Sequence, residues 1–476
     1  MAEILTPDLC VIGAGSGGLA VAEAARAHDA SVVIVEKGRL GGNALHIGAT
    51  PARALAAAAD HAQALREAPL FGISAEELKV NFRKVHDHVN AVIAALSPAQ
   101  AAPRFEALGA TILAAEGRFV DKRTLVAGDT LVRARHFVIA TGGRAEVPAI
   151  PGLDAVPFFT TDTILDNTRK LTHLVVVGGG PLALQLAQSY RRLGSEVTVV
   201  EAGLFLPDAD PELAAVVLKR LAEEGVRLLP SSSVAAIQAR SMGIGVSVNA
   251  PDGEVALDAS QILVATGRWP MLDGLDLDKA GIRRSKADPT HLQLNRAGRT
   301  SNPAVFAIGE AAGTDMVHAA RRQAAQVVRS ALFGLPAASD PLAVPRVLHT
   351  DPELAEVGLS ERAARTRHGL GFRVTRLSFA DNDRARAART PYGVVKLITT
   401  RSGRLLGAGI AGPGAAELGA LFALALASGT TVAQLATLAA PYGSYAEIVN
   451  RLADLAVTQA PNPILTRLLS LRRLLG

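Results

Sequence analysis

The stretch VIGAGSGGLAVAEAARAHDASVVIVEKG, residues 11–38, decides how the first part of this chain folds. An apolar β run enters a glycine turn, a helical segment follows, and a second β run ends on the acid Glu36. Gly13, Gly15 and Gly18 have the spacing GxGxxG: the first glycine permits the tight turn, the second lets backbone N–H groups approach a pyrophosphate, and the third keeps helix and strand close. The stretch therefore predicts a βαβ unit that binds a dinucleotide at the N-terminus of its helix, with Glu36 on the ribose.

Residues 176–203, VVGGGPLALQLAQSYRRLGSEVTVVEAG, repeat this pattern without a gap. Gly178, Gly180, Ala183 and Glu201 take the places of the three glycines and the acid. One GxGxxG is weak evidence, but two in the same context indicate two bound dinucleotides and electron transfer between them. Because a 2′-phosphate facing Glu201 would be repelled, the second site is expected to prefer NAD over NADP. An ordinary tight βα connection is the alternative explanation for each turn.

Composition narrows the class of protein. The chain has 476 residues, which suggests about three domains. Its net charge of +5 comes from intermingled acids and bases, so nucleic-acid binding is not expected. The single cysteine, Cys10, lies in the first β run and is expected to be a small core residue, so neither a disulfide nor a thiolate metal site is predicted. No apolar run is long enough to span a bilayer, and we expect a protein of the reducing cytoplasm.

Three further segments are predicted to be buried strands that end in polar or glycine turns. HFVIATGG (136–143) and ILVATGR (262–268) each end in Ala-Thr-Gly, and VFAIGEAAG (305–313) ends in glycine and an acid. That acid, Glu310, is expected to accept a hydrogen bond from a polyol such as the ribityl chain of a flavin. Each segment alone is an ordinary strand end, and their order along the chain carries the signal.

In that order the chain, from about residue 5 to residue 457, resembles the pyridine nucleotide–disulfide oxidoreductases, which include dihydrolipoamide dehydrogenase, glutathione reductase and mercuric reductase. TDPELAEVGLSE (350–361) and DNDRARA (381–387) resemble their C-terminal dimerisation domain, the latter most closely in mercuric-reductase-like members. The resemblance implies FAD at the first turn, NAD(H) at the second, and a homodimer whose C-terminal domain completes the partner's active site. Besides the residues of the two turns, the positions it assigns to cofactor binding are Lys37, Gly42, Asn43, Gly117, Ala140, Thr141, Gly142, Gln185, Gly267, Gly309 and Glu310.

The departures from the family concern its chemistry. Where the family has GG-x-C-x4-C-x-P-x-K, this chain has GGNALHIGATPAR (41–53), so Ala44 and Ala49 take the cysteine positions and Arg53 the lysine position. An alanine neither accepts electrons from a flavin nor attacks a disulfide, because the thiolate is the nucleophile. Disulfide reduction and thiolate-assisted mercuric reduction are therefore excluded. His46, between the two alanines, is a candidate acid–base group, with a histidine held by backbone contacts as the alternative.

The C-terminal base of the family is replaced as well. Its His-Pro-Thr-x-x-Glu motif aligns with PYGSYAE (441–447), so Tyr442 takes the histidine position and Glu447 remains. Tyr442 is a candidate proton donor, although a phenol of pKa about 10 is a poor base at neutral pH; the alternative is a packing role at the dimer interface. Engineered cysteine removal would explain Ala44 and Ala49 but not Arg53 or Gln185, so a natural cysteine-less paralogue is preferred.

These patterns predict an α/β protein with two doubly wound Rossmann-like domains and a C-terminal α+β dimerisation domain. The expected boundaries are 1–148 with 270–340 for FAD, 149–269 for NAD, 341–460 for dimerisation, and 461–476 for a basic, leucine-rich tail. That tail, with Arg467, Arg472 and Arg473, is either a helix packed on the dimer, a frayed terminus, or a weak contact with a membrane surface.

The leading functional hypothesis is an FAD-dependent NADH oxidoreductase that passes electrons to a quinone, another small molecule, oxygen or a protein partner instead of a disulfide. Its expected catalytic residues are Arg53, Tyr442, Glu447 and His46, and no metal is expected. Arg53 would stabilise negative charge on the reduced flavin. The alternative is an FAD-binding pseudoenzyme that binds a partner or senses NADH. An FAD-linked dehydrogenase of a small organic substrate ranks last, since no base for it is identifiable.

Overall fold

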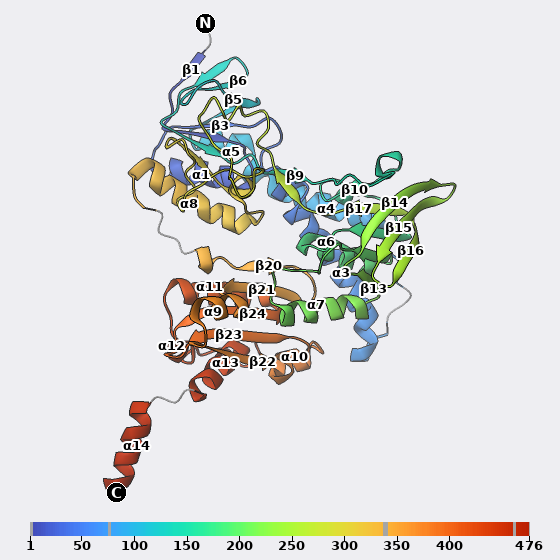
Figure 1. Cartoon of the computed structure of the whole chain (residues 1–476), viewed down its shortest axis with the longest axis vertical. Coiled ribbons are helices and arrows are strands. Elements are labelled where there is room, and N and C mark those ends of the chain that lie inside the picture. Colours follow the sequence, from blue (N-terminus) through green and yellow to red (C-terminus); the bar gives the residue numbers. More distant parts are fainter. Residues whose placement is uncertain (1–2, 75–77, 337–340, 460–462, 476) are drawn as a thin grey trace. The chain divides into compact units, whose positions relative to one another are not determined.

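The computed structural model describes residues 3–74, 78–336, 341–459 and 463–475 (Figure 1). The chain divides into two compact units, one formed by residues 1–200 and 232–339 and the other by residues 201–231 and 340–476. Each unit is described by itself. The domain boundaries expected from the sequence stay predictions, because this division follows compactness and not ligand binding.

In the first unit, a five-stranded parallel sheet with the order β19-β8-β2-β3-β4 contains the first glycine turn. Its strands are β2 (Leu9–Ile12), β3 (Val32–Val35), β4 (Ala110–Leu113), β8 (His136–Ile139) and β19 (Val305–Ala307). β2 and β3 are buried at every position, as expected for strands covered on both faces. α1 (Ser16–Arg26) and α8 (Val317–Phe333) pack together beside this sheet (Figure 1).

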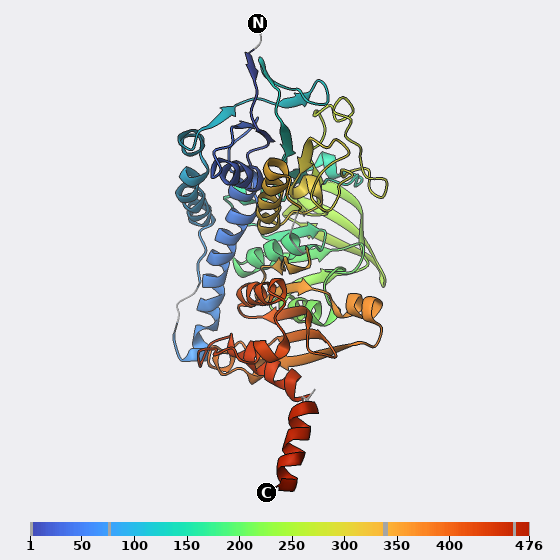
Figure 2. The same ribbon diagram turned by 90° about the vertical axis from the view of Figure 1, so that its left-hand side faces the viewer.

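The same part of the chain contains further helices and a smaller sheet. The helices are α2 (Gly42–His46), α3 (Ala49–Glu67), α4 (Phe82–Leu96) and α5 (Ala102–Ala107), and α3 is the long blue helix in Figure 2. A smaller sheet, in the order β1-β7-β6-β5, contains β1 (Glu3–Leu5), β5 (Gly117–Phe119), β6 (Leu125–Ala127) and β7 (Thr130–Val132). Cys10 is fully buried in the core between the two sheets, as expected, and burial raises the pKa of its thiol.

The second glycine turn lies in another parallel sheet of the first unit. Its strands β10 (Phe159–Thr160), β17 (Gln261–Val264), β11 (His173–Val177) and β12 (Glu196–Val200) lie side by side in this order. α6 (Pro181–Arg192) follows the turn, and the antiparallel sheet β14 (Ser233–Arg240), β15 (Gly243–Ala250) and β16 (Gly253–Ala259) completes this part. Two short strands, β9 (Gly143–Ala145) and β18 (Arg268–Pro270), pair antiparallel where the chain passes between the two nucleotide-binding parts.

The second unit is built on an antiparallel sheet with the order β20-β21-β24-β23-β22, which agrees with the α+β class expected for the C-terminal region. Its strands are β20 (Arg346–Leu348), β21 (Glu353–Gly358), β22 (Phe372–Ser378), β23 (Val394–Thr400) and β24 (Leu405–Gly412). Its helices are α7 (Pro211–Glu223), α9 (Glu361–His368), α10 (Asp383–Ala387), α11 (Ala415–Ala427), α12 (Val432–Leu435), α13 (Glu447–Thr458) and α14 (Pro463–Leu475), and the segment 201–231 adds β13 (Val226–Leu229). Phe422 of α11 and Leu452 of α13 are fully buried in the core of this unit.

Candidate functional site

In the first glycine turn, backbone atoms pack tightly against Gly13 and Gly18, whereas the space beside Gly15 is open. Gly13 has φ +104°, and a Cβ added there would collide with the carbonyl of Ala140 at the end of β8. A Cβ on Gly18 would collide with the Gly13 carbonyl oxygen, so α1 approaches the turn as closely as glycine permits. No atom lies within 4 Å of the corresponding position on Gly15, which begins the helix. This open backbone before a helix N-terminus fits a pyrophosphate.

Glu36 lies beside this turn, at the end of β3. Its Oε2 accepts a hydrogen bond from the backbone N–H of Ala14 (2.6 Å), and its Oε1 accepts one from that of Gly38 (2.7 Å). The backbone therefore fixes the orientation of the carboxylate, as a ribose ligand requires. The next residue, Lys37, forms an exposed ion pair with Glu116 (2.7 Å), which lowers the pKa of that carboxyl.

The segment that replaces the family's redox loop packs against the same turn. Gly42 approaches Gly15 so closely that an added Cβ would lie 2.7 Å from the Gly15 Cα. Asn43 donates from Nδ2 to the carbonyl oxygen of Gly143 (2.5 Å). His46 is hydrogen-bonded through Nε2 to the Leu40 carbonyl oxygen (2.8 Å), which is the backbone contact weighed as the alternative to an acid–base role.

Within this segment the two positions of the missing thiols are accessible. Ala44 is half-buried and Ala49 is exposed at the start of α3. Arg53, one turn further along α3, is exposed too.

An ion-pair cluster surrounds Glu310, directly after β19. Arg268 donates from Nε to Glu310 Oε1 (2.6 Å), from Nη1 to Asp162 Oδ1 (2.5 Å) and from Nη2 to the Gly143 carbonyl oxygen (2.7 Å). Burial alone would lower the pKa of Arg268, but the two carboxylates outweigh it and the pKa is raised. The sequence predicted a cofactor role for Glu310, but neither Arg268 nor Asp162 was assigned one. Arg268 ends the quoted ILVATGR segment, whereas Asp162 carries no signal.

The other positions expected to bind the first cofactor lie directly after strands of the same sheet, except Gly117, which lies in the smaller sheet. Thr141 follows β8, and its Oγ1 is buried without a hydrogen-bond partner in the described part of the chain. Gly309 donates its N–H to Gln323 Oε1 (2.8 Å), a contact that the sequence did not predict. Gly117 begins β5 and packs against Leu125 and Val35. Ala140 and Gly142 flank Thr141, and Gly142 has φ +66°.

The second turn repeats the geometry of the first. Gly178 has φ +112°, and an added Cβ would collide with the Ala265 carbonyl, whereas no atom lies within 4 Å of that position on Gly180. Ala183, at the third position, is buried, and Gly267 follows Ala265 with φ +154°. Gln185 is 7% exposed, and its Nε2 is buried without a hydrogen-bond partner among the residues described.

Glu201 repeats a contact of Glu36. Its Oε1 accepts a hydrogen bond from the backbone N–H two residues later, that of Gly203 (2.8 Å), as Glu36 does with Gly38. Within the first unit, the two turns, the oriented Glu36 and the unpaired atoms of Thr141 and Gln185 fit two dinucleotides.

In the second unit, Tyr442 lies at the surface and is 83% exposed. Its hydroxyl donates to Asp383 Oδ2 (3.2 Å), and this hydrogen bond raises the pKa of the phenol above its usual value. Glu447 Oε2 accepts the backbone N–H of Gly443 (2.9 Å) at the start of α13. At neutral pH the phenol of Tyr442 is therefore protonated.

Among the described residues, no group of three or more His, Cys, Asp or Glu side chains is arranged to hold a metal ion. No helix in the same ranges has the length and hydropathy needed to cross a membrane.

Comparison with known proteins agrees with the geometry. The family description "Pyridine nucleotide-disulphide oxidoreductase" matches residues 7–324, and its dimerisation domain matches residues 344–453. A mercuric reductase of Streptomyces lividans is 33% identical over 448 residues, which cover 92% of this chain and 94% of that protein. A dihydrolipoyl dehydrogenase of Geobacillus stearothermophilus is 32% identical over 463 residues, covering 94% of this chain and 96% of the enzyme.

Among solved structures, LpdA of Mycobacterium tuberculosis superposes with a TM-score of 0.86 at 25% identity, over 95% of this chain and 99% of that one. The flavoprotein disulfide reductase RclA of Escherichia coli shares the fold, with a TM-score of 0.81 at 23% identity, over 94% of this chain and 99% of RclA. The chain therefore belongs to the pyridine nucleotide-disulphide oxidoreductase family.

Proposed function

We propose that this flavin-dependent oxidoreductase takes electrons from NADH and delivers them to an acceptor that is not a disulfide, such as a quinone, another small molecule or a protein partner. Like other members of its family, it uses FAD and NAD(P)H, and its dimerisation domain supports a homodimer. The NADH preference and the kind of acceptor are the new parts of the proposal.

The observation that carries it is the loop from Gly42 to Ala49, which keeps its contacts with the first turn but has no thiol. Ala44 and Ala49 take the two cysteine positions, and Cys10 is fully buried in β2. Because only a thiolate attacks a disulfide, this chain lacks the sulfur atoms that the electron relay of the family requires. The related mercuric and dihydrolipoyl enzymes therefore do not define the substrate here.

When bound, FAD accepts a hydride from NADH and passes the two electrons on to the acceptor. The chain's own residues bind and orient: Gly15 and Gly180 leave room for the pyrophosphates, and Glu36 and Glu201 present carboxylates held by backbone N–H groups. We assign the unpaired Nε2 of Gln185 to the nicotinamide end of NADH. Tyr442, kept protonated by Asp383, is the proton donor for an acceptor that must be protonated on reduction.

The C-terminal helix supports a quinone in particular. Residues 461–476 contain three arginines and no acid, and Leu468, Leu469 and Leu471 are about half exposed on α14. A basic, leucine-rich helix binds anionic lipid surfaces, where quinones dissolve. We propose a cytoplasmic enzyme that touches the membrane weakly. Co-sedimentation with anionic vesicles tests this contact, and a chain truncated after residue 460 is the control.

The first experiment is an anaerobic titration of the purified holoenzyme with NADH, followed through the visible absorption band of the flavin. We expect full bleaching at one equivalent of NADH per FAD, with a much slower response to NADPH. A spectrum that NADH leaves unchanged, while dithionite bleaches it, would overturn the proposal in favour of an FAD-binding pseudoenzyme. Once bleaching is established, re-oxidation by a water-soluble quinone, compared with an oxidised dithiol, tests the class of acceptor.

A further inference from the structure

Arg268 occupies the place where the chain returns from the second nucleotide-binding part to the first. It begins β18, which pairs antiparallel with β9 in the register Arg268 to Ala145 and Pro270 to Gly143. β9 and β18 follow the two Ala-Thr-Gly turns, so this strand pair includes both passages of the chain between the two parts. A side chain that begins here can contact residues of both parts.

Its guanidinium donates to three close acceptors, and Nη1 also lies 3.5 Å from Thr161 Oγ1. Nε binds Glu310 (2.6 Å), Nη1 binds Asp162 (2.5 Å), and Nη2 binds the Gly143 carbonyl oxygen (2.7 Å). The side chains of Arg268, Asp162 and Glu310 are 18%, 22% and 17% exposed, so these charges are largely shielded from water. A planar guanidinium suits three diverging acceptors, which an ammonium group would not satisfy together.

The contacts of Arg268 extend to the segment that lost its thiols. The Gly143 carbonyl oxygen that accepts from Arg268 also accepts from Asn43 Nδ2 (2.5 Å), next to Ala44. On the other side, Asp162 Oδ2 accepts the backbone N–H of Ala145 in β9 (2.9 Å). One guanidinium thus joins the former redox loop, the strand pair and the acid after β19.

Glu310 is held so that only one of its oxygens is used by the chain. Oε1 accepts a hydrogen bond from Arg268, whereas Oε2 accepts none from the described residues. The carboxylate lies directly on the turn after β8: an added Cβ at Gly143 would lie 2.7 Å from Oε1, and one at Gly142 would lie 3.3 Å from Oε2. This leaves Oε2 as an acceptor for a hydroxyl group of the cofactor.

We propose that Arg268 is a positioning residue for FAD: it holds Glu310 so that the second carboxylate oxygen binds a hydroxyl group of the cofactor, and it thereby couples FAD retention to the β9–β18 strand pair. The proposal depends only on FAD binding, which the family shares. It is therefore independent of the electron acceptor and of NADH preference, and its failure is distinguishable from theirs.

The test measures release of FAD from the holoenzyme, as the fluorescence rise after dilution, with circular dichroism to monitor the fold. We expect Arg268→Gln and Glu310→Gln each to speed release about tenfold, as for loss of a charged hydrogen bond. The double variant should release FAD no faster than the faster single variant, because both changes remove one contact. Arg268→Lys keeps the charge but reaches fewer acceptors, so its rate should fall between those of wild type and Arg268→Gln.

The matched control is Arg144→Gln, on β9. Arg144 is exposed, and in the described part of the chain its ion pair is with the surface acid Asp273 (3.6 Å). Its release rate should equal that of wild type. The proposal is overturned if Glu310→Gln retains FAD as wild type does, or if the effects of the two substitutions multiply. Should Arg268→Gln fail to fold, the same cycle is run with Arg268→Lys, and multiplication there is equally contradictory.

Discussion

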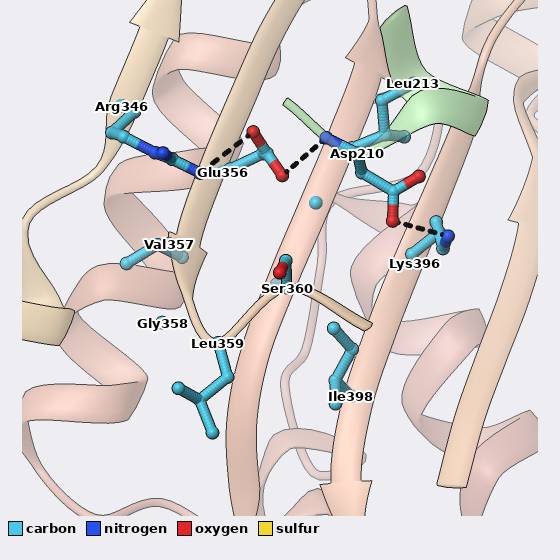
Figure 3. A pocket seen from close by; sticks show the side chains of 12 residues that line it. Asp210, Leu213, Arg346, Glu356, Val357, Gly358, Leu359, Ser360, Lys396 and Ile398 are labelled. Atoms are coloured by element: carbon cyan, nitrogen blue, oxygen red, sulfur yellow. Dashed lines mark hydrogen bonds and ion pairs between the residues drawn. The ribbon is translucent and has the colours of Figure 1, made fainter. Parts of the chain in front are cut away.

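Replacing Lys396 by methionine should destabilise the second unit strongly, although Lys396 is far from either glycine turn in sequence. Its side chain is 3% exposed, and its ammonium group lies 2.7 Å from Asp210, 2.9 Å from Glu212 and 3.1 Å from Glu361. Figure 3 shows Asp210, at the start of α7, directed at Lys396 of β23 while its backbone N–H points to Glu356. The network thus fastens the segment 201–231 to the antiparallel sheet.

The size of the stability loss depends on which of the three carboxylates keep a second cation among the described residues. Methionine preserves most of the side-chain volume, so the loss is electrostatic. Arg376 remains on Glu212 (2.9 Å) and Glu361 (2.6 Å), but the buried Asp210 carboxylate is left without the lysine. Removing one partner of a buried ion pair costs about 3–5 kcal/mol, and the remaining arginine places this case near 3 kcal/mol. For a unit of this size we expect the melting temperature to fall by about 6–12 °C.

The cost should depend on pH in a direction that follows from the carboxyl groups. Burial alone would raise the pKa of Glu212 and Glu361, but Lys396 and Arg376 outweigh it and both values are lowered. A carboxyl group whose pKa is lowered on folding stabilises the fold at pH values above its usual pKa of 4.5. This stabilisation is lost as the pH falls through the pKa of the folded state. The difference between wild type and Lys396→Met should therefore be largest at neutral pH and shrink below about pH 4.5.

The assay is thermal unfolding by circular dichroism at neutral and acidic pH. Lys219→Met is the control on α7, the helix that also carries Glu212, because Lys219 is 78% exposed and its contact with Glu223 is long (3.8 Å). Its effect should stay within about 0.5 kcal/mol. Adding Asp210→Asn to Lys396→Met should restore much of the loss, since it removes the stranded charge. The argument is refuted if Lys396→Met melts with the control, or if Asp210→Asn worsens it.

Three further outcomes are expected. Gly18→Ala brings a Cβ into the Gly13 carbonyl, so it should cost about 1–3 kcal/mol and lower the flavin-to-protein ratio of the purified enzyme; a normal ratio would contradict the packing argument. Glu201→Arg should lower kcat/KM with NADH and raise it with NADPH, and unchanged values for both would remove Glu201 from the ribose site. The pKa of Tyr442 is measured by ultraviolet titration, as the difference between wild type and Tyr442→Phe. It should lie above the usual value of 10.0 and decrease in Asp383→Asn. The same midpoint in both proteins would show that Asp383 does not raise the pKa of the phenol.

The two glycine turns were predictable because their physics is local. Gly13 and Gly178 need a positive φ, and the glycine pattern that indicates this need lies within a run of fewer than ten residues. The acids Glu36 and Glu201 follow at a distance set by one helix and one strand. The α+β class of the C-terminal region was also expected, and the structure has it, with an antiparallel sheet.

The ion pairs beside the candidate site and in the core of the second unit were not predictable in this way. Arg268 meets Glu310 across 42 residues of sequence, and Lys396 meets Asp210 across 186. An arginine at a strand end and a lysine in an apolar strand have no spacing that indicates a partner, because the partner comes from another element. Only the folded chain shows that these charges are shielded and paired.

The missing cysteines and the intact loop are compatible for a physical reason. The loop is positioned by its backbone and by side chains other than the two alanines: Gly42 packs on Gly15, Asn43 binds Gly143, and His46 binds the Leu40 carbonyl. None of these contacts uses a thiol, so exchanging cysteine for alanine removes the reactive sulfur without removing the scaffold. The first nucleotide site therefore keeps its shape while its usual electron relay is absent. A site in that state either delivers electrons directly or does not deliver them, and the NADH titration distinguishes the two.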